Sequence, residues 1–366
     1  MTVDNLINWF SPLGDSPALF FLMAALISAV PVFLFMAVYA IVAIYAELKI
    51  SSFMQDKVGP MGQGVGLHAG KWGLLQPVAD ALKLLLKEDI IPAAADRKLF
   101  IMAPFIVFTG AFAALAALPY NQKLVVVDLN IGVLYILAVG SLGVIGLLMA
   151  GWSSNNKWSL YGAMRSAAQI ISYEIPAAMS IIAAIMMAET MSMNGMVEVQ
   201  AGHIWGILPN WFIFDNPFAT CAFVIFFISG LAECNRTPFD IPEAESELVA
   251  GWMTEYSGFR WSIFFLSEYA NMLIVSIVAS IVFLGGWLSP LQMFNIFPES
   301  WNFLDGPVMG LVWVMTKAIL LIFIMMWFRW TFPRLRVDQL MYLCWKVFVP
   351  FALLNLFLVS LWELIL

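Results

Sequence analysis

The chain has 366 residues, of which 62% are hydrophobic, 15% aromatic and only 11% charged. Soluble domains are about 45–50% apolar and about 25% charged, so this composition excludes a soluble globular protein and indicates an integral membrane protein. The net charge of -7 and the lack of a basic tract argue against nucleic-acid binding. Three scattered cysteines and two histidines predict neither a disulfide framework nor a metal site or iron–sulfur cluster held by this chain alone.

Windows of about 20 apolar residues predict transmembrane helices. We predict an all-α fold with about eight such helices in a single polytopic domain over residues 1–366. The predicted spans are Leu19–Ala46, Phe100–Leu118, Ile131–Gly151, Ala167–Ala188, Pro217–Leu231, Trp261–Trp287, Val308–Trp327 and Val347–Leu364. Because no Lys or Arg precedes Lys49, we expect the first span to be retained and not cleaved as a signal peptide.

Positive charge predicts the orientation, because cytoplasmic connections are rich in Lys and Arg. Fifteen of the 17 Lys and Arg residues lie in four connections, at about residues 47–99, 152–166, 232–260 and 328–346. We therefore expect these connections to face the cytoplasm, with both termini on the outer side of the membrane.

The first of these connections contains an amphipathic pattern at Gly73–Glu88. Its apolar residues recur at helical spacing, and its charged residues lie on or near the opposite side. The segment is too short and too charged to span the membrane, so we expect a helix at the membrane interface. A simple surface anchor would have the same pattern, and this alternative stays open.

Four ionisable residues lie at membrane depth, where such groups are costly and by default indicate function. Glu174 and Glu268 are about two turns into the fourth and sixth predicted spans from the cytoplasmic side. Glu233 is at the cytoplasmic end of the fifth span, and Lys317 is near the middle of the seventh. The alternative is that these groups simply form ion pairs, for example Lys317 with a glutamate of a neighbouring helix.

Pro176 follows Glu174 by two residues within the fourth predicted span. Proline lacks the backbone N–H, so it should free the carbonyl of Ser172 from its helical hydrogen bond. A glutamate beside a freed backbone carbonyl is a plausible point for water to enter.

The segment from Glu233 to Glu247 holds five carboxylates and Arg236 within fifteen residues. Clustered carboxylates repel one another when ionised, which favours proton exchange near neutral pH. Alternatively, Asp240 caps a helix that begins at Pro242, and the glutamates of its first turn complement the helix dipole. Capping explains one or two of the acids but not the whole group.

Several separated motifs together resemble the complex I subunit 1 family, which includes the H-type subunit of the proton-pumping NADH:quinone oxidoreductase of bacteria. They are Gln55–Pro60, Gly73–Glu88, Gly151–Asn155, Ala168–Glu174, Glu233–Glu247, Glu268–Tyr269 and Pro333–Met341. The resemblance covers nearly the whole chain after the first span. It implies a respiratory-chain subunit of the bacterial inner membrane, part of a translocase and not catalytic alone.

The resemblance also implies roles for individual residues. The quinone cavity and its entrance would involve Lys49, Lys57, Asp80, Glu88, Arg236, Phe239 and Asp240. A proton path to antiporter-like subunits would involve Glu174, Glu233, Glu243, Glu245, Glu247 and Glu268. Arg334, Arg336 and Asp338 would hold the cytoplasmic face against the peripheral arm. Quinone would be the substrate, whereas NADH, FMN and iron–sulfur clusters would belong to partner subunits.

The sequence departs from the family pattern near the expected quinone entrance. Leu48 and Lys57 stand where the family usually has arginine, and Lys57 exchanges a planar fork for a point charge. The stretch between Pro60 and Leu74 also has additional residues, among them His68.

Two other classes of function are alternatives to the NADH-linked complex. A related membrane-bound hydrogenase or ferredoxin-linked complex shares an ancestral version of this subunit. A stand-alone ion or proton transporter would also use buried carboxylates, but it predicts inverted repeats, and the two halves of this chain show no convincing similarity.

Overall fold

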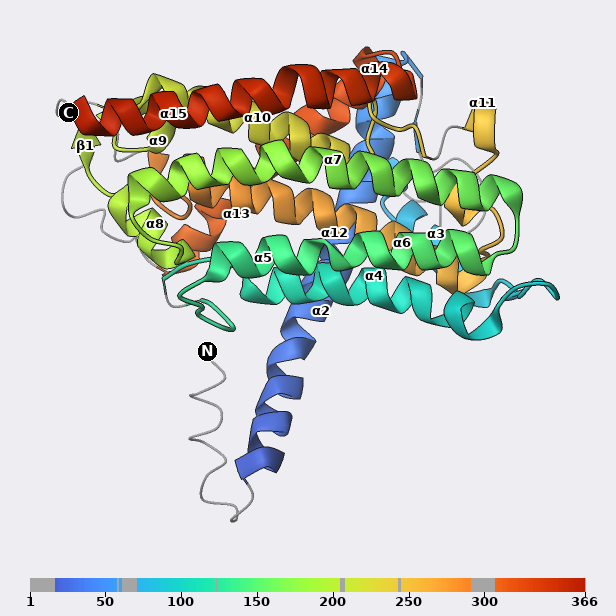
Figure 1. The fold of residues 1–366 in the computed structure, drawn as a ribbon. Coiled ribbons are helices and arrows are strands. Elements are labelled where there is room, and N and C mark those ends of the chain that lie inside the picture. Colours follow the sequence, from blue (N-terminus) through green and yellow to red (C-terminus); the bar gives the residue numbers. More distant parts are fainter. Residues whose placement is uncertain are drawn as a thin grey trace.

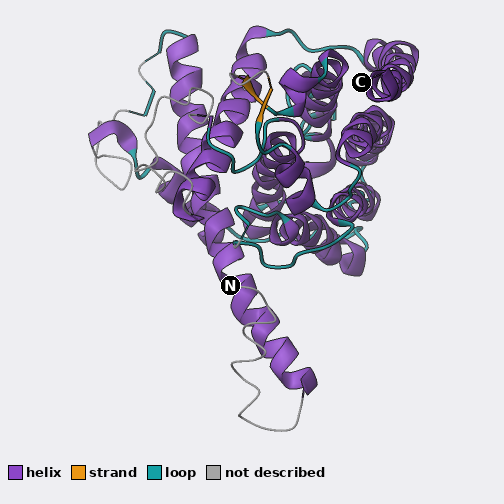
Figure 2. Ribbon diagram, turned by 90° about the vertical axis from the view of Figure 1, so that its left-hand side faces the viewer, coloured by secondary structure: helices purple, strands orange, loops and turns teal. Residues whose placement is uncertain are grey.

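The computed structural model describes residues 17–57, 59–60, 71–122, 124–204, 208–242, 245–290 and 307–365. In this part of the chain helices dominate, with one antiparallel pair of two-residue strands, β1 (His203–Ile204) and β2 (Leu208–Pro209). Most of the long helices run side by side, whereas α2 (Pro17–Met54) crosses them and extends beyond the bundle (Figures 1 and 2). The all-helical prediction is therefore confirmed apart from this short strand pair.

The other helices follow in chain order. The longer ones are α4 (Arg97–Ala117), α6 (Leu142–Ser153), α7 (Lys157–Ala188), α10 (Pro217–Glu233), α12 (Gly258–Phe283), α13 (Pro307–Thr331) and α15 (Val349–Ile365). The shorter ones are α3 (Gln76–Leu86), α5 (Gly132–Gly140), α8 (Met193–Val199), α9 (Phe212–Asp215), α11 (Glu245–Leu248) and α14 (Val337–Tyr342). Two 3₁₀ turns, Lys71–Gly73 and Gly251–Met253, and a π-helix, Leu343–Phe348, complete the described helical structure.

Seven helical runs in the described chain are long and apolar enough to cross a membrane. They are Met23–Met54, Arg97–Ala117, Gly132–Ser153, Lys157–Ala188, Gly258–Phe283, Val308–Thr331 and Val337–Ile365. The remaining predicted span corresponds to α10, which has 17 residues and is shorter than the other candidates. A multi-pass membrane protein is thus confirmed, while the eighth span and the orientation stay predictions.

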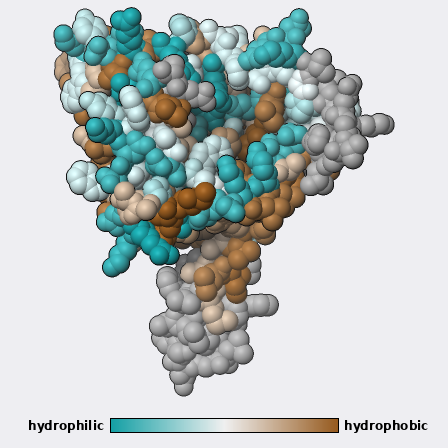
Figure 3. All heavy atoms as spheres, turned by 90° about the vertical axis from the view of Figure 1, so that its right-hand side faces the viewer, coloured by the Kyte–Doolittle hydropathy of each residue, from teal (hydrophilic) through white to brown (hydrophobic). Residues whose placement is uncertain are grey.

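The connections predicted to be cytoplasmic gather at one end of the bundle. Helices α3 and α11 and the turn between α6 and α7 lie at the right-hand end of Figure 1, and the C-terminus, α8 and α9 lie at the opposite end. Hydrophilic residues dominate this right-hand face (Figure 3). A hydrophilic end of this kind suits a surface outside the hydrocarbon layer.

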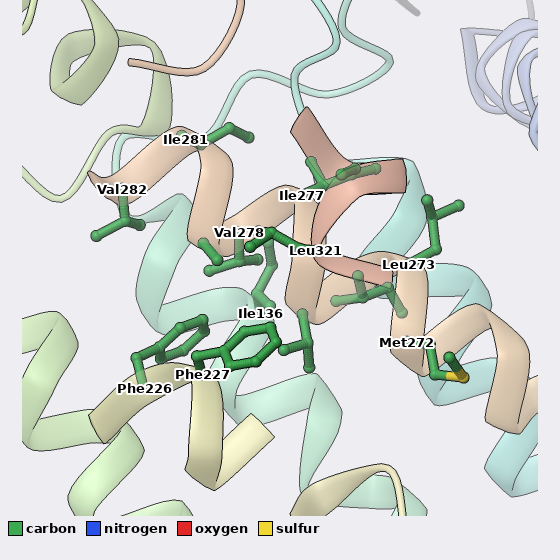
Figure 4. Close-up of a cluster of buried hydrophobic side chains, with 14 of the residues drawn as sticks. Ile136, Phe226, Phe227, Met272, Leu273, Ile277, Val278, Ile281, Val282 and Leu321 are labelled. Atoms are coloured by element: carbon green, nitrogen blue, oxygen red, sulfur yellow. The ribbon is translucent and has the colours of Figure 1, made fainter. Parts of the chain in front are cut away.

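Helix α12 forms the centre of the bundle. Every residue from Met272 to Phe283 is buried, as expected for a helix that is apolar on all sides. Around it pack Phe226 and Phe227 of α10, Ile136 of α5 and Leu321 of α13 (Figure 4). Side chains that α12 carries near its middle are therefore held in the interior.

The predicted amphipathic helix is confirmed, although it is shorter than Gly73–Glu88. It begins at Gln76 with Pro77 in the first turn, where proline is favoured because no helical donor is lost, and it ends at Leu86. Leu82, Leu85 and Leu86 are exposed, so the described residues leave the apolar side of α3 uncovered. Such a side suits the membrane interface or a partner surface.

Aromatic stacking fixes the segment before α12 against the start of α4. The rings of Phe100 and Tyr256 stack with their centroids 4.0 Å apart, and the Tyr256 hydroxyl donates to the Phe100 carbonyl at 3.2 Å. Burial raises the pKa of Tyr256 to about 12, so the phenol stays protonated and remains a donor at neutral pH. Arg260 lies over the Phe100 ring and forms an ion pair with Asp89 at 3.1 Å, which ties the end of the α3 connection to the same place.

Helix α7 depends on a distant helix at the position of its proline. The Ser172 carbonyl, which Pro176 was predicted to free, accepts a hydrogen bond from the Cys344 thiol at 3.0 Å. The indole Nε1 of Trp345 donates to the Ser172 hydroxyl at 3.2 Å, and the Tyr173 hydroxyl donates to the Leu340 carbonyl at the same distance. The π-helix that contains Cys344 therefore supplies the donor that α7 lacks.

Substitution of Cys344 tests this contact. Cys344→Ala should lower the stability of the protein by about 1–3 kcal/mol, because a buried carbonyl loses its donor. Cys344→Ser keeps a donor and should cost less. The measurement is the fraction of detergent-solubilised protein that remains monodisperse after heating. Equal losses in the two variants would contradict a role for the thiol as a donor and would indicate packing alone.

Candidate functional site

A group of charged side chains is buried where α2, α12, α13 and the loop after α10 meet. The Arg236 guanidinium lies 2.7 Å from a carboxylate oxygen of Glu47 and 2.7 Å from one of Glu268. Glu47 also accepts hydrogen bonds from the Tyr269 hydroxyl and from Arg329. These five residues are called the buried ion network below.

Arg236 is the centre of the buried ion network. It is only 4% exposed, and its guanidinium also lies over the Tyr269 ring, 4.8 Å from the ring centroid. Charged groups are stable in a low-dielectric interior only when they are paired and hydrogen-bonded. Two arginines and two glutamates balance in charge, so the network is neutral as a whole when all four are ionised.

The backbone after α10 places Arg236 inward. Helix α10 ends at Glu233, and Asn235 adopts a left-handed conformation with φ of 51° that turns the chain. The Gln169 amide of α7 holds this turn: it donates to the carbonyls of Ala232 and Phe239, each at 2.8 Å, and to the Asn235 side chain at 3.1 Å. A buried glutamine thus fixes the loop that carries the central arginine.

One cavity lies next to the buried ion network, and a second cavity shares part of its lining. Glu233 and Asn271 line both cavities. Glu268, which belongs to the network, lines the first, and Glu174 lines the second. The structure therefore places three of the predicted proton-path glutamates on the walls of two neighbouring cavities.

The other predicted proton-path residues belong to the charged loop and α11. Glu243 lies outside the described residues, as does the side chain of Glu245, the first residue of α11. Glu247 is 58% exposed and forms an ion pair with Arg165 of α7 at 2.6 Å. Its placement at the surface contrasts with the half-buried Glu233.

The helix-capping alternative for Asp240 stays a prediction, because residues 243 and 244 lie outside the described residues. Pro242 lies in a turn, and the described part of helix α11 begins at Glu245. The Asp240 carboxylate forms an ion pair with Arg334 at 2.8 Å. A cation from a distant connection is therefore one of its partners.

Among the predicted quinone residues, Phe239 is buried and Lys49 is half-buried. Phe239 packs against the Tyr173 ring with the centroids 5.3 Å apart, on the same loop as Arg236. Lys49 of α2 donates to the Pro60 carbonyl at 2.7 Å. Arg236, Phe239 and Asp240 therefore lie together, as residues of one loop.

Lys57, Asp80 and Glu88 are placed nearer to solvent. Lys57 is exposed and donates to the Gln55 side chain at 2.9 Å. Asp80 lies on α3 and forms an ion pair with Lys83 at 3.3 Å, and Glu88 is exposed just beyond the end of α3. Lys57 and Glu88 are exposed and Asp80 is partly exposed, so these three residues do not belong to the buried ion network.

Lys317 has no carboxylate partner among the described residues, so the suggested pairing with a glutamate is wrong. Its ammonium group donates to the carbonyls of Leu284, Gly286 and Leu288 at 2.7, 2.8 and 2.9 Å. It also lies over the Trp211 ring, 4.1 Å from the centroid. Three carbonyls use all three donors of the ammonium.

The turn after α12 creates this carbonyl site. Gly285 and Gly286 both have positive φ, 71° and 48°, which turns the backbone so that the carbonyls converge on Lys317. The buried amide of Gln200 completes the helix end: it donates to the Ile281 carbonyl at 2.9 Å and accepts from the Gly285 N–H at 2.9 Å. A helix C-terminus carries partial negative charge, so a cation there is favourable.

Glu47 and Asn271 did not emerge as site residues from the sequence. The apolar window ended at Ala46, one residue before Glu47, but α2 continues to Met54 and carries Glu47 into the interior. An acidic residue directly at the end of a span was the available signal. Asn271 is a single amide in an apolar helix, a weaker signal of the same kind.

Comparison with known proteins places the chain among membrane subunits of respiratory enzymes. A family model described as NADH dehydrogenase matches residues 27–360. The chain is 51% identical over 358 residues to the H-type subunit of NADH-quinone oxidoreductase from Chlorobaculum tepidum, covering 97% of this chain and 94% of that protein. It is 44% identical over 354 residues to the subunit of the same name from Anaeromyxobacter dehalogenans, covering 94% and 83%. The chain therefore belongs to the NADH dehydrogenase family represented by these NADH-quinone oxidoreductase subunits.

Proposed function

We propose that this chain, as a membrane subunit of NADH-quinone oxidoreductase, forms the quinone cavity and couples quinone reduction to proton translocation. In this proposal the loop with Arg236, Phe239 and Asp240 faces the quinone, and Lys49, Lys57, Asp80 and Glu88 border its entrance. Partner subunits of the peripheral arm hold NADH, FMN and the iron–sulfur clusters. The chain works in a bacterial inner membrane, and no reaction is assigned to it alone.

The observation that supports this proposal most directly is the junction between the buried ion network and the cavities. Glu268 contacts Arg236 on one side and lines a cavity with Glu233 on the other. A change of charge near Arg236 alters how strongly its guanidinium holds Glu268, and hence how readily Glu268 accepts a proton. Glu233 lines a cavity with Glu268 and another with Glu174, so in this proposal the change extends to these two glutamates through interaction between ionisable groups.

Contacts at the hydrophilic end support the expected position of the peripheral arm. Arg334 pairs with Asp240, so the connection before α14 is joined to the loop that carries Arg236. The Arg336 N–H donates to the Gln339 side chain at 3.2 Å, and Asp338 lies in the first turn of α14. We propose that this ordered surface binds the peripheral arm, while other membrane subunits receive the protons.

Glu233→Gln in the assembled complex tests the coupling. The change removes a titratable group with little change in shape, so proton pumping driven by NADH oxidation should fall at least about 100-fold, the lower end of what a proton-transfer group supplies. The measurement compares NADH–quinone turnover with proton uptake into inverted membrane vesicles. Glu198→Gln is the matched control, because Glu198 is exposed in the connection after α7. Undiminished turnover and pumping in Glu233→Gln would refute the proposed role.

A further inference from the structure

Two helical glycines in the span formed by α5 and α6 lack the usual structural reason for a glycine. Glycine destabilises a helix interior by about 1 kcal/mol relative to alanine, and close packing commonly explains its presence. At Gly146 and Gly151 of the same span, an added Cβ would lie 2.4 Å from the Val107 side chain and 2.2 Å from that of Ala163. Those two glycines permit close helix contact.

Gly140 and Gly143, the glycine pair, have different surroundings. Among the described residues, an added Cβ at Gly143 would meet nothing within 4 Å. At Gly140 it would meet the Glu233 carboxylate oxygen at 3.5 Å, an ordinary contact distance. Neither glycine has a positive φ. The pair flanks the break between α5 and α6 at Ser141. Close packing and a positive φ do not account for it, and its missing side chains border open space.

This open space is the region where the two cavities adjoin. The glycine pair lines both the cavity with Glu268 and the cavity with Glu174. Glu233 and Asn271 line both as well. A buried water requires about two to four polar partners. The side chains of Glu174, Glu233, Glu268 and Asn271 provide such partners. Larger side chains at the pair would extend into the space beside both cavities.

We propose that the glycine pair keeps open a water-filled passage through which protons move among Glu174, Glu233 and Glu268. In each transfer a carboxylic acid gives one proton to water, and water gives one to the next carboxylate. The donor becomes a carboxylate and the acceptor becomes an acid, without any change in electron count. Asn271 holds the water by hydrogen bonding and does not titrate. This inference rests on the proposed function, because it concerns the same glutamates.

Substitutions at Gly143 test the passage. Gly143→Val and Gly143→Thr introduce side chains of the same shape, but only threonine offers a hydroxyl that can join a water chain. In the assembled complex, Gly143→Val should lower NADH-driven proton pumping about 100-fold, the lower limit for loss of a proton-transfer step. Gly143→Thr should retain more activity. The solvent isotope effect on turnover should rise in Gly143→Val, because proton movement becomes the slow step.

Gly132→Ala is the matched control. Gly132 is the first residue of α5, its added methyl group would lie 3.5 Å from Met193, and it lines neither cavity. This variant should pump like the wild type. Gly143→Ala serves as a smaller change if Gly143→Val fails to assemble, and the isotope effect then decides: an increase supports the passage and an unchanged value overturns it.

The outcomes separate this inference from the proposed function. Pumping in Gly143→Val equal to that in Gly132→Ala would overturn the passage, and so would equal losses in the valine and threonine variants. If Glu233→Gln loses pumping while Gly143→Val keeps it, the coupling role stands and the passage fails. If Glu233→Gln keeps full pumping, the proposed function itself fails.

Discussion

Arg236→Met should lower the free energy of unfolding by about 3–5 kcal/mol, the typical effect of removing one partner of a buried ion pair. Glu268 loses the guanidinium that lies 2.7 Å from its carboxylate, in an interior where an unpaired charge is costly. Glu47 is less affected, because Arg329 and the Tyr269 hydroxyl still contact it. The first measurement is the midpoint temperature of heat inactivation of the detergent-solubilised complex. The second is the amount of this subunit that remains assembled after heating.

Two further variants make the Arg236 result specific. Arg165→Met removes the cation of a partly exposed pair with Glu247, and exposed pairs contribute about 0–1 kcal/mol. It should therefore have little effect. Adding Glu268→Met to Arg236→Met should restore part of the lost stability, because no unpaired carboxylate is left at that position. A double variant less stable than Arg236→Met alone would show that Glu268 is stabilised by groups other than Arg236.

Lys317→Met should destabilise the protein by at least about 3 kcal/mol, because three carbonyls at the end of α12 lose their common donor and each unsatisfied buried group costs about 1–3 kcal/mol. The lost contact with the Trp211 ring adds to this effect. Lys317→Arg should recover only part of the stability, because a planar guanidinium cannot place its donors as a compact ammonium does. The same heat-inactivation measurement applies.

Lys346→Met is the control for Lys317→Met. Lys346 also lies over an aromatic ring, that of Tyr342 at 4.8 Å, but its side chain is exposed. Its loss should change stability by less than about 1 kcal/mol, as expected for an exposed charge. If the two methionine variants were equally stable, the carbonyl site would have no special energetic importance.

Hydrophobicity located the spans because lipid permits few backbone structures other than helices. The same reasoning found Glu174, Glu233 and Glu268 from their depth alone. It could not find the partners of Arg236, since Glu47 is 189 residues away in sequence and reaches it only through the crossing of α2. The partners of Lys317 were equally hidden, because they are backbone carbonyls and any residue type supplies one.

The glycine pair illustrates another limit of the sequence. A glycine in an apolar run is compatible with close packing, a turn or open space, and the residue type alone does not distinguish these. Gly146 and Gly143 are three positions apart in one helix, yet one borders Val107 and the other borders a cavity. The distinction depends on neighbouring helices whose registers are set by the whole bundle.

The hydrogen bond from Cys344 to the Ser172 carbonyl has a consequence for the order of folding. These residues are 172 positions apart, so α7 leaves the ribosome long before the segment that completes it. Until then the carbonyl freed by Pro176 must be satisfied by water or by a transient neighbour, because lipid offers no donor. Helix α7, and Glu174 with it, can therefore reach its final hydrogen bonding only after the last helix of the chain has been synthesised and has packed against it.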